Sequence, residues 1–124
     1  ENMIVHEYEG AFQTNGNNVL KKEWKYKLLN TLEFNSARKR MSVVVREPDE
    51  LGGRVVLMCK GADSIVAQRL TEESLRSTDF LQTQTEVDKY ANEGLRTLFL
   101  AHRYLDEQTY QEWNAKAYEA SCLI

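Results

Sequence analysis

Alternation of apolar and polar residues in the first half of the chain predicts consecutive β-strands. Residues 25–34 place apolar side chains such as Tyr26 and Leu28 on one face and Lys, Thr and Glu on the other, which is the period of a half-buried strand. Residues 39–46 include three consecutive β-branched valines and are strand-like, and residues 54–59 are largely apolar, as is typical of a strand buried on both faces. We therefore expect these three strands to form an antiparallel meander.

Turn-forming residues separate these strands. Pro48 and the pair Gly52-Gly53 indicate a loop, because proline blocks a strand and glycine accepts tight turns. Residues 3–8 predict an earlier strand that leads to a candidate partner at 11–14. Asn15-Gly16-Asn17-Asn18 is typical of a hairpin turn.

Helical spacing dominates the second half of the chain. A short helix is expected after Lys60-Gly61-Ala62, with Asp63 or Ser64 as its N-cap. The polar stretch 71–78 predicts a mobile connection. A helix over 79–93 is expected next, with Val87, Tyr90 and Ala91 as its apolar face and Gly94 at its C-cap.

The last elements complete an α+β pattern. Residues 95–101 alternate as a strand, and Asp106 caps a helix whose Tyr110, Trp113 and Ala117 are expected to face the core. Together the elements predict an antiparallel sheet of about six strands flanked by helices.

Length and composition favour one domain covering residues 1–124. The chain has 124 residues, of which 42% are apolar, enough for one core and too few for two ordinary domains. Its formal net charge of -3, with both signs interleaved, favours neither nucleic acid nor an anionic membrane as partner. Any anion site must therefore be local.

The cysteines and histidines do not indicate a metal site or a disulfide framework. Cys59 and Cys122 lack metal-ligand spacing, and neither histidine belongs to a Cys/His cluster. No apolar run reaches the roughly 18 residues needed to span a bilayer. Because the chain begins at Glu1 rather than Met and stops just after a helical pattern, we interpret it as an excised domain.

Candidate chemistry lies in the turn between the first two meander strands. This turn carries an aromatic residue beside hydroxyl and cationic groups: Phe34, Ser36, Arg38, Lys39 and Arg40. An aromatic face beside cations suits a ligand that has a flat base and an anion. A solvated basic turn is the alternative interpretation of the same residues.

Two further segments, one at Lys60 and Gly61 and one at Arg96, also allow either a ligand-binding or a purely structural interpretation. Gly61 removes a side chain where a flat ring could approach the backbone, or it is a turn residue beside a surface lysine, Lys60. Arg96 opens an otherwise apolar strand, so it needs an anion or water as partner. The glycine-rich G-x-x-x-x-G-K-[ST] phosphate loop is absent from the sequence.

Three motifs in order resemble the nucleotide-binding domain of P-type ATPases. They are Glu-Phe-Asn-Ser-x-Arg-Lys-Arg-Met-Ser-Val from Glu33, Cys-Lys-Gly-Ala-Asp-Ser from Cys59, and Glu-Gly-Leu-Arg-Thr-Leu from Glu93. The resemblance covers about residues 26–121. Asp63 stands where the ion pumps of this family usually have proline, so the chain looks most similar to the phospholipid-transporting (flippase) branch.

The resemblance implies a site that holds ATP. In such a site an aromatic ring stacks on adenine, a lysine lines the adenine pocket, and the remaining groups contact polar and phosphate atoms. The implied residues are Phe34 at adenine, Lys60 with Gly61 beside it, Ser36 and Lys39 at polar groups of the nucleotide, and Arg96 and Thr97 at the ribose-phosphate end.

The same resemblance implies that the chemistry occurs outside this chain. The family transfers the γ-phosphate to an aspartate in another domain, and its Asp-Lys-Thr-Gly segment is absent here. No residue of this chain is then catalytic or a metal ligand, and Mg²⁺ is held elsewhere in the pump. The implied partners are ATP and the phosphorylation and actuator domains of the same polypeptide. The chain would be a cytoplasmic part of an integral membrane protein, joined to the membrane only through transmembrane segments outside it.

Other functions are distinguishable from this one. A hydrolase would need a nucleophile with a base in reach, and Ser42 or Ser64 with His102 and an Asp is only a coincidence of composition. A nucleic-acid module is disfavoured by the acidic total. A cation-transporting ATPase domain and a protein-interaction domain that binds no nucleotide stay as alternatives. Saturable ATP-dependent chemical-shift changes confined to the three motifs would exclude the interaction domain.

Overall fold

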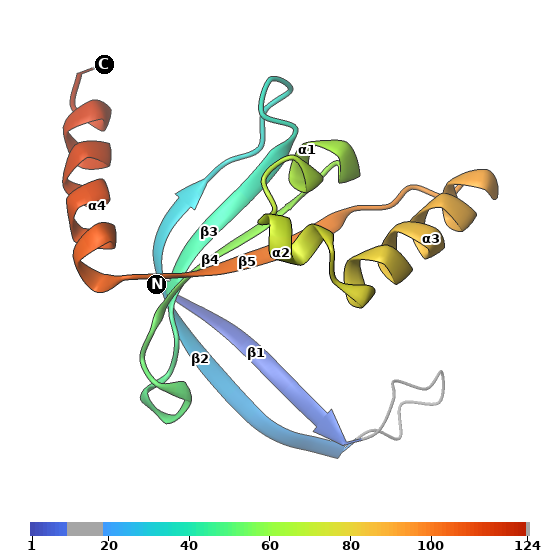
Figure 1. Cartoon of the computed structure of the whole chain (residues 1–124). Coiled ribbons are helices and arrows are strands. Elements are labelled where there is room, and N and C mark those ends of the chain that lie inside the picture. The colour runs from blue at the N-terminus through green and yellow to red at the C-terminus, as the bar shows by residue number, and fades with distance from the viewer. Residues whose placement is uncertain (10–18, 124) are drawn as a thin grey trace. The chain divides into compact units, whose positions relative to one another are not determined.

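The computed structural model describes residues 1–9 and 19–123 of the chain. Within these residues it contains one antiparallel five-stranded sheet in the order β1-β2-β3-β4-β5 (Figure 1). The strands are β1 (Asn2–Glu9), β2 (Val19–Leu32), β3 (Arg40–Arg46), β4 (Val55–Gly61) and β5 (Phe99–Leu105). Consecutive strands are therefore neighbours throughout, which confirms the predicted meander.

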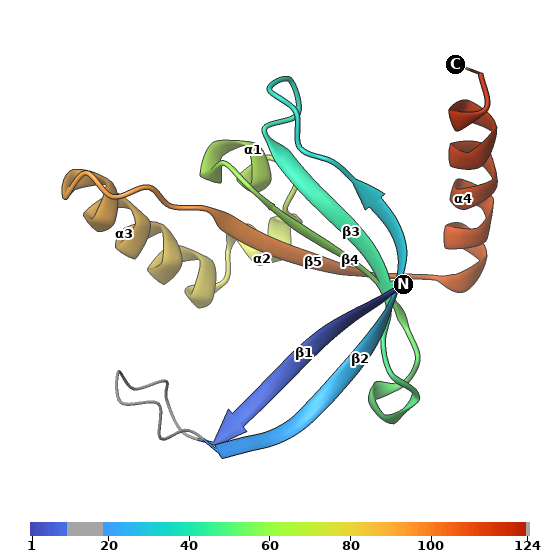
Figure 2. The ribbon, with the colours of Figure 1, turned by 180° about the vertical axis from the view of Figure 1, so that it is seen from behind.

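The described residues form five of the about six expected strands. β2 begins earlier than predicted and runs continuously from Val19 to Leu32. The candidate strand at 11–14 and the turn at 15–18 lie outside the described residues. β1 pairs antiparallel with β2, with Met3 opposite Tyr26 and Val5 opposite Trp24, and Figure 2 shows these two strands side by side from behind.

Helices complete the predicted α+β class, which the structure confirms. They are a short 3-10 helix η1 (Asp49–Leu51), α1 (Asp63–Ala67), α2 (Glu72–Leu75), α3 (Thr78–Asn92) and α4 (Glu107–Ser121). α4 begins as predicted, since the Asp106 side chain accepts a hydrogen bond from the backbone N–H of Thr109.

Two local features differ in detail from the sequence prediction. The N-cap position of α1 is Ala62 and Asp63 is the first helical residue, yet Asp63 Oδ1 accepts from the backbone N–H of Ser64 at 2.8 Å and so caps one of the first amides. The stretch 71–78, predicted as a mobile connection, contains α2. Thr71 caps α2 by accepting from the N–H of Ser74, and Ser77 caps α3 by accepting from the N–H of Phe80.

The chain forms two compact units. Unit 1 comprises residues 1–30, 44–57 and 103–124, and unit 2 comprises residues 31–43 and 58–102. β2, β3, β4 and β5 each contribute residues to both units.

Unit 1 has a core of valines and one tyrosine. Val44, Val45, Val55 and Val56 are at most 2% exposed; because neighbours in a strand point to opposite faces, β3 and β4 are buried on both faces here. Tyr110 of α4 is buried as predicted, and burial raises its pKa.

Polar contacts hold α4 within unit 1. The hydroxyl of Tyr110 donates to Asn30 Oδ1 at 2.5 Å, and Asn30 Nδ2 donates to Asn114 Oδ1 at 3.0 Å. Trp113, which was expected to face the core with Tyr110, is 38% exposed.

Unit 2 has its own core between strands and helices. Val66 of α1, Val87 of α3 and Phe99 of β5 are buried together, and Cys59 and Phe80 pack against them. Val87 lies in the core as predicted. Tyr90 and Ala91 were expected beside it, but both are exposed. Phe80 replaces them, with its ring edge-on to Phe99 at a centroid distance of 6.2 Å.

Candidate functional site

Antiparallel pairing brings the predicted site segments to one end of the sheet in unit 2. The end of β2, the start of β3, the end of β4 and the start of β5 all lie at that end, because neighbouring strands run in opposite directions. The three sequence motifs occupy these four strand ends. Figures 1 and 2 show the turn before β3 beside the end of β4 from both sides.

The turn between β2 and β3 is built on an asparagine. Asn35 Oδ1 accepts from the backbone N–H groups of Ala37 at 3.0 Å and Arg38 at 2.7 Å. The backbone N–H of Lys39 donates to the Asn35 carbonyl oxygen at 2.8 Å. Such an Asx turn fixes the backbone locally, and it leaves the ring of Phe34 64% exposed just before it. Ser36 is exposed within the turn.

Lys39 joins this turn to the end of β4. It has a φ of 54°, a left-handed conformation that costs energy for a residue with a β-carbon. Its carbonyl oxygen accepts from the N–H of Ala62 at 3.1 Å. This bond connects the first motif to the second.

Position 61 requires a glycine, because the turn before β3 approaches the end of β4 closely there. A β-carbon at Gly61 would lie 2.6 Å from both the Lys39 carbonyl oxygen and Arg40 Cβ. Our expectation from sequence was that the missing side chain admits a flat ring. The space is instead filled by the backbone and β-carbon of this chain.

The alternation of β4 places its last residues on two faces. Cys59 packs against the core under α1 and α3, so Gly61, two residues on, lies on the same helix-covered face. Arg40 shares that face, because its β-carbon lies where a β-carbon of Gly61 would point. Lys60 is exposed and lies on the opposite face.

Arg96 and Thr97 lie in the segment that leads into β5. The predicted strand at 95–101 is wrong at its start, since β5 begins at Phe99. Gly94 has a φ of 80° directly after the α3 C-cap, as the sequence predicted for a helix end. In this segment Arg96 is exposed and Thr97 is half-buried.

The predicted site residues thus lie at one end of the sheet, where some contact each other and others expose their side chains. Lys39 and Gly61 touch directly. Phe34, Ser36, Lys60 and Arg96 present exposed side chains at that end. This arrangement offers a free aromatic face and several cations, the groups that a base and a phosphate require.

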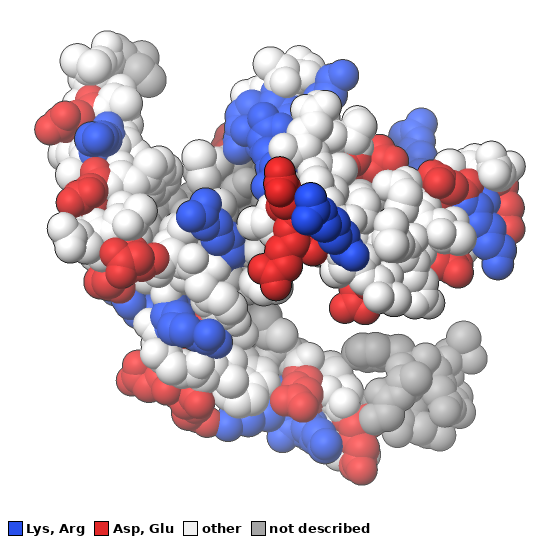
Figure 3. Space-filling view, viewed as in Figure 1, with Lys and Arg blue, Asp and Glu red and all other residues white. Residues whose placement is uncertain are grey.

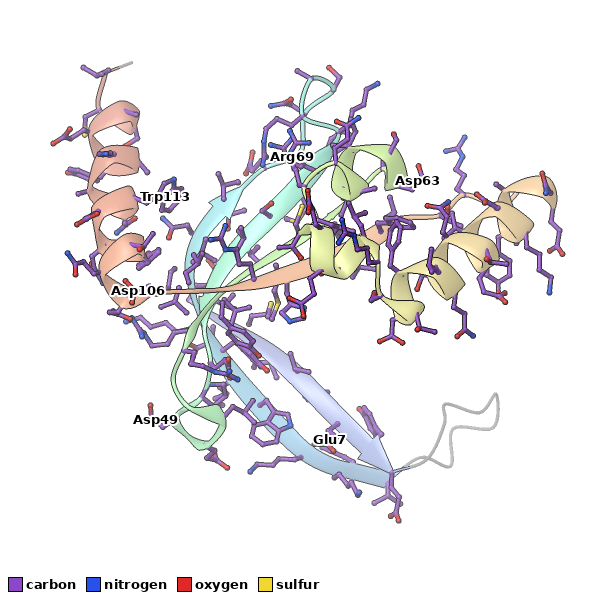
Figure 4. The ribbon with its side chains drawn as sticks, viewed as in Figure 1. Glu7, Asp49, Asp63, Arg69, Asp106 and Trp113 are labelled. Carbon is purple, nitrogen blue, oxygen red and sulfur yellow. The ribbon has the colours of Figure 1, made fainter. Side chains whose placement is uncertain are left out.

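Sequence reasoning missed Arg69, whose positive charge acts on Arg40. Burial, together with the positive charges of Arg69 and Arg38, lowers the pKa of Arg40. Figure 3 shows Lys and Arg side chains gathered over the turn before β3, and Figure 4 shows Arg69 close to this turn. Arg69 follows a five-residue helix, and no sequence pattern indicated that it returns toward β3.

The described part of the chain offers neither a metal cluster nor a membrane span. Residues 1–9 and 19–123 contain no group of three or more His, Cys, Asp or Glu side chains placed to hold a metal ion. No helix within these residues is long and apolar enough to cross a membrane.

Comparisons with known proteins agree with the three motifs. The family model of the P-type ATPase cytoplasmic domain N matches residues 7–123. Probable phospholipid-transporting ATPase 11 of Arabidopsis thaliana is 48% identical over 95 residues, 77% of this chain and 8% of that protein. Phospholipid-transporting ATPase DRS2 of Saccharomyces cerevisiae is 46% identical over 102 residues, 82% of this chain and 7% of that protein. Phospholipid-transporting ATPase ID of Homo sapiens is 48% identical over 99 residues, 77% of this chain and 8% of that protein. The chain therefore spans less than a tenth of the length of these relatives.

Proposed function

Since the chain belongs to the family of P-type ATPase cytoplasmic domain N, as the match over residues 7–123 establishes, we propose that it binds ATP by the adenine end. The γ-phosphate is then presented to an aspartate in another domain of the same polypeptide. The observation that carries this proposal is the gathering of all three motifs at one end of the sheet in unit 2.

Phe34 supplies the adenine contact in this proposal. Its ring is 64% exposed, and an exposed aromatic face stacks on a base through its π surface. Lys60 contributes an aliphatic stem beside the base and an ammonium group toward the phosphates. Gly61 acts indirectly, because its missing side chain lets Lys39 approach β4.

The remaining residues contact the polar end of the nucleotide. Ser36 and Lys39 donate hydrogen bonds from the turn, and Arg96 and Thr97 contact the ribose and phosphates from the segment before β5. These groups position the nucleotide and take no part in proton transfer. We assign Mg²⁺ to ligands beyond this chain, in the complete pump.

We extend the proposal to phospholipid transport by the whole protein. The relatives named above are phospholipid-transporting ATPases, and Asp63 stands where the ion pumps of the family usually have proline. In this function ATP bound here supplies the phosphoryl group that drives lipid translocation. This chain would then be a cytoplasmic part of a membrane protein, with the phosphorylation and actuator domains as partners.

An NMR titration of the ¹⁵N-labelled chain with ATP tests the proposed binding. One stacked ring and a few exposed charges must offset the entropy of association, so we expect a Kd of about 0.1 to 10 mM. Saturable shifts should be confined to residues 33–43, 59–64 and 93–98. Saturable shifts confined to unit 1 would contradict binding at the three motifs, and the absence of saturable shifts would contradict nucleotide binding and favour a protein-interaction domain.

Replacing Phe34 tests the adenine contact. Phe34→Ala should weaken adenosine, AMP and ATP by similar factors, because a stacking surface is worth about 1–3 kcal/mol whatever phosphates follow. Tyr118→Ala is the matched control, since it removes another exposed aromatic ring, on α4 of unit 1. Equal weakening by both variants would show that Phe34 has no specific role.

A further inference from the structure

Besides Arg96, three arginines of unit 2 have no acidic partner among the described residues. Arg38, Arg40 and Arg69 belong to none of the ion pairs formed by the described residues. Their guanidinium groups donate to backbone carbonyls instead. Arg38 Nη1 donates to Glu33 O at 2.6 Å, Arg40 Nη1 to Arg38 O at 3.0 Å, and Arg69 Nη1 to Ile65 O at 3.0 Å.

These carbonyl contacts orient the guanidinium groups without neutralising them. A backbone carbonyl is a dipole, so the full positive charge of each arginine persists, and a guanidinium has five N–H donors of which these bonds use one or two. Like charges held close together repel each other. The lowered pKa of Arg40 has this repulsion among its causes, after burial. An anion placed among the three would relieve it.

Arg40 and Arg69 also lie on a different face from the proposed nucleotide contact at Lys60. Arg40 and Gly61 share the helix-covered face of the sheet with Cys59. Lys60 follows Cys59 directly in β4, so its side chain leaves the opposite face. Arg69 comes after α1, on the helix-covered side, and Figure 4 shows it close to the start of β3.

We propose that Arg40 and Arg69, with Arg38 orienting Arg40, form a second anion site on the helix-covered face that binds a phosphate monoester dianion. Guanidinium groups match phosphate oxygens bidentately, which makes arginine suited to this ligand. The site is separate from the adenine contact at Phe34 and does not depend on it. Inorganic phosphate and the headgroup of a phosphomonoester lipid such as phosphatidic acid carry the same chemistry.

The test uses the 124-residue chain, with inorganic phosphate as the first probe. Phosphate added at constant ionic strength should shift the side-chain Nε–Hε signals of Arg40 and Arg69 saturably, whereas acetate at the same ionic strength should not. Arg69→Gln should weaken phosphate binding about tenfold, the factor expected for loss of one charge-assisted contact. Arg69→Lys keeps the charge without the fork and should fall between Arg69→Gln and the native chain.

Controls separate this site from general charge effects and from the nucleotide site. Arg76→Gln removes the same charge from an exposed arginine that pairs with Glu72 at 3.8 Å, and it should leave phosphate binding unchanged. Phe34→Ala should also leave it unchanged, while Arg69→Gln should not alter adenosine binding. If Phe34→Ala abolishes adenosine and phosphate binding together, the second site does not exist.

Vesicles identify the source of the phosphate group. Phosphatidylcholine vesicles with and without phosphatidic acid should be compared in cosedimentation with the native and Arg69→Gln chains. Arg69-dependent binding of inorganic phosphate alone supports a site for a small soluble anion. Arg69-dependent binding of the phosphatidic acid vesicles alone supports a site for a lipid headgroup. If neither binding depends on Arg69, the proposal is wrong.

Discussion

Three cations of unit 1 and three of unit 2 differ in the partners that their side chains contact. In unit 1, Arg46 pairs with Glu107, Arg54 with Glu47 and Lys22 with Glu50. In unit 2, the guanidinium groups of Arg38, Arg40 and Arg69 donate hydrogen bonds to backbone carbonyls. The ion pair found among the described residues of this unit joins the exposed side chains of Arg76 and Glu72. Paired charges stabilise a fold, whereas oriented but unneutralised charges are suited to a ligand. We therefore infer a structural role for Arg46, Arg54 and Lys22 of unit 1, and the proposed binding role for Arg38, Arg40 and Arg69 of unit 2 fits the same difference.

Removing Arg54 should have the largest effect on stability. The side chain of Glu47 is 5% exposed, its Oε2 accepts a hydrogen bond from Arg54 Nη2 at 3.3 Å, and Arg54 Nε lies 3.1 Å from its Oε1. Arg54→Gln therefore leaves a buried carboxylate without its cation. We expect a loss of about 3 kcal/mol in the free energy of unfolding. The stacking of Arg54 on the Tyr104 ring, at 3.8 Å from its centroid, is lost as well.

Urea unfolding of Arg54→Gln measures this loss. Lys22→Gln is the matched control, because it breaks a pair whose side chains are 41% and 62% exposed and should cost at most about 1 kcal/mol. A loss for Arg54→Gln no larger than that of Lys22→Gln would mean that unit 1 does not depend on its buried pair.

Gly61→Ala should have the next largest effect, in unit 2. The new β-carbon would meet the Lys39 carbonyl and Arg40 Cβ at 2.6 Å, so the turn before β3 must move away from β4. Such overpacking costs about 2 kcal/mol. Urea unfolding measures the cost, and amide shifts at residues 38–42 should report the movement.

The neighbouring position supplies the control for this steric argument. Lys60→Ala changes an exposed side chain of β4 that points to the other face, so stability should change by less than about 0.5 kcal/mol. An unfolding midpoint for Gly61→Ala equal to that of Lys60→Ala would refute the close approach seen at Gly61.

The sequence predicted the strands and helices better than the tertiary contacts of individual residues. Strands β3 and β4 were predictable because alternation and turn residues such as Pro48 mark them locally, whereas β2 was predicted only from residue 25 although it begins at Val19. The start of β5 was predicted four residues too early, because Leu95 to Leu98 alternate like a strand. Where β5 begins to pair depends on the position of β4, its neighbour in the sheet. The three motifs located the candidate site. Arg69 could not be found, because its approach to Arg40 depends on how α1 packs, a tertiary contact that no local pattern encodes.

Arg96→Ala should have a smaller effect, and on binding instead of stability. We propose that Arg96, exposed before β5, contacts the phosphates. Its removal should weaken ATP by about 1 kcal/mol at low salt, because an exposed charge contact is worth little more. The effect should vanish for adenosine and shrink as ionic strength rises. Titrations with adenosine, AMP and ATP at two salt concentrations measure this effect. Equal weakening of adenosine and ATP binding at both salt concentrations would show that Arg96 does not contact the phosphates.

The smallest expected effect concerns the exposed pair between Arg46 and Glu107 in unit 1. Arg46 donates to both carboxylate oxygens of Glu107, at 2.8 and 3.1 Å. The hydrogen bond from Arg46, followed by that from Gln111, lowers the pKa of Glu107. A carboxyl whose pKa is lower in the folded chain stabilises the fold at pH values above its unfolded pKa, about 4.3 for glutamate. That contribution is lost as the pH falls from there through the folded pKa.

Unfolding midpoints of the native chain and Glu107→Gln, measured from pH 7 to pH 3, test this dependence. Glu107→Gln should be slightly less stable at pH 7, and the gap should close in acid, because protonation then removes the same charge from the native chain. Glu119→Gln is the control on the same helix, since Glu119 takes part in none of the ion pairs of the described residues. A gap that stays constant down to pH 3 would show that the charge of Glu107 contributes nothing, and that unit 1 relies on its buried pair alone.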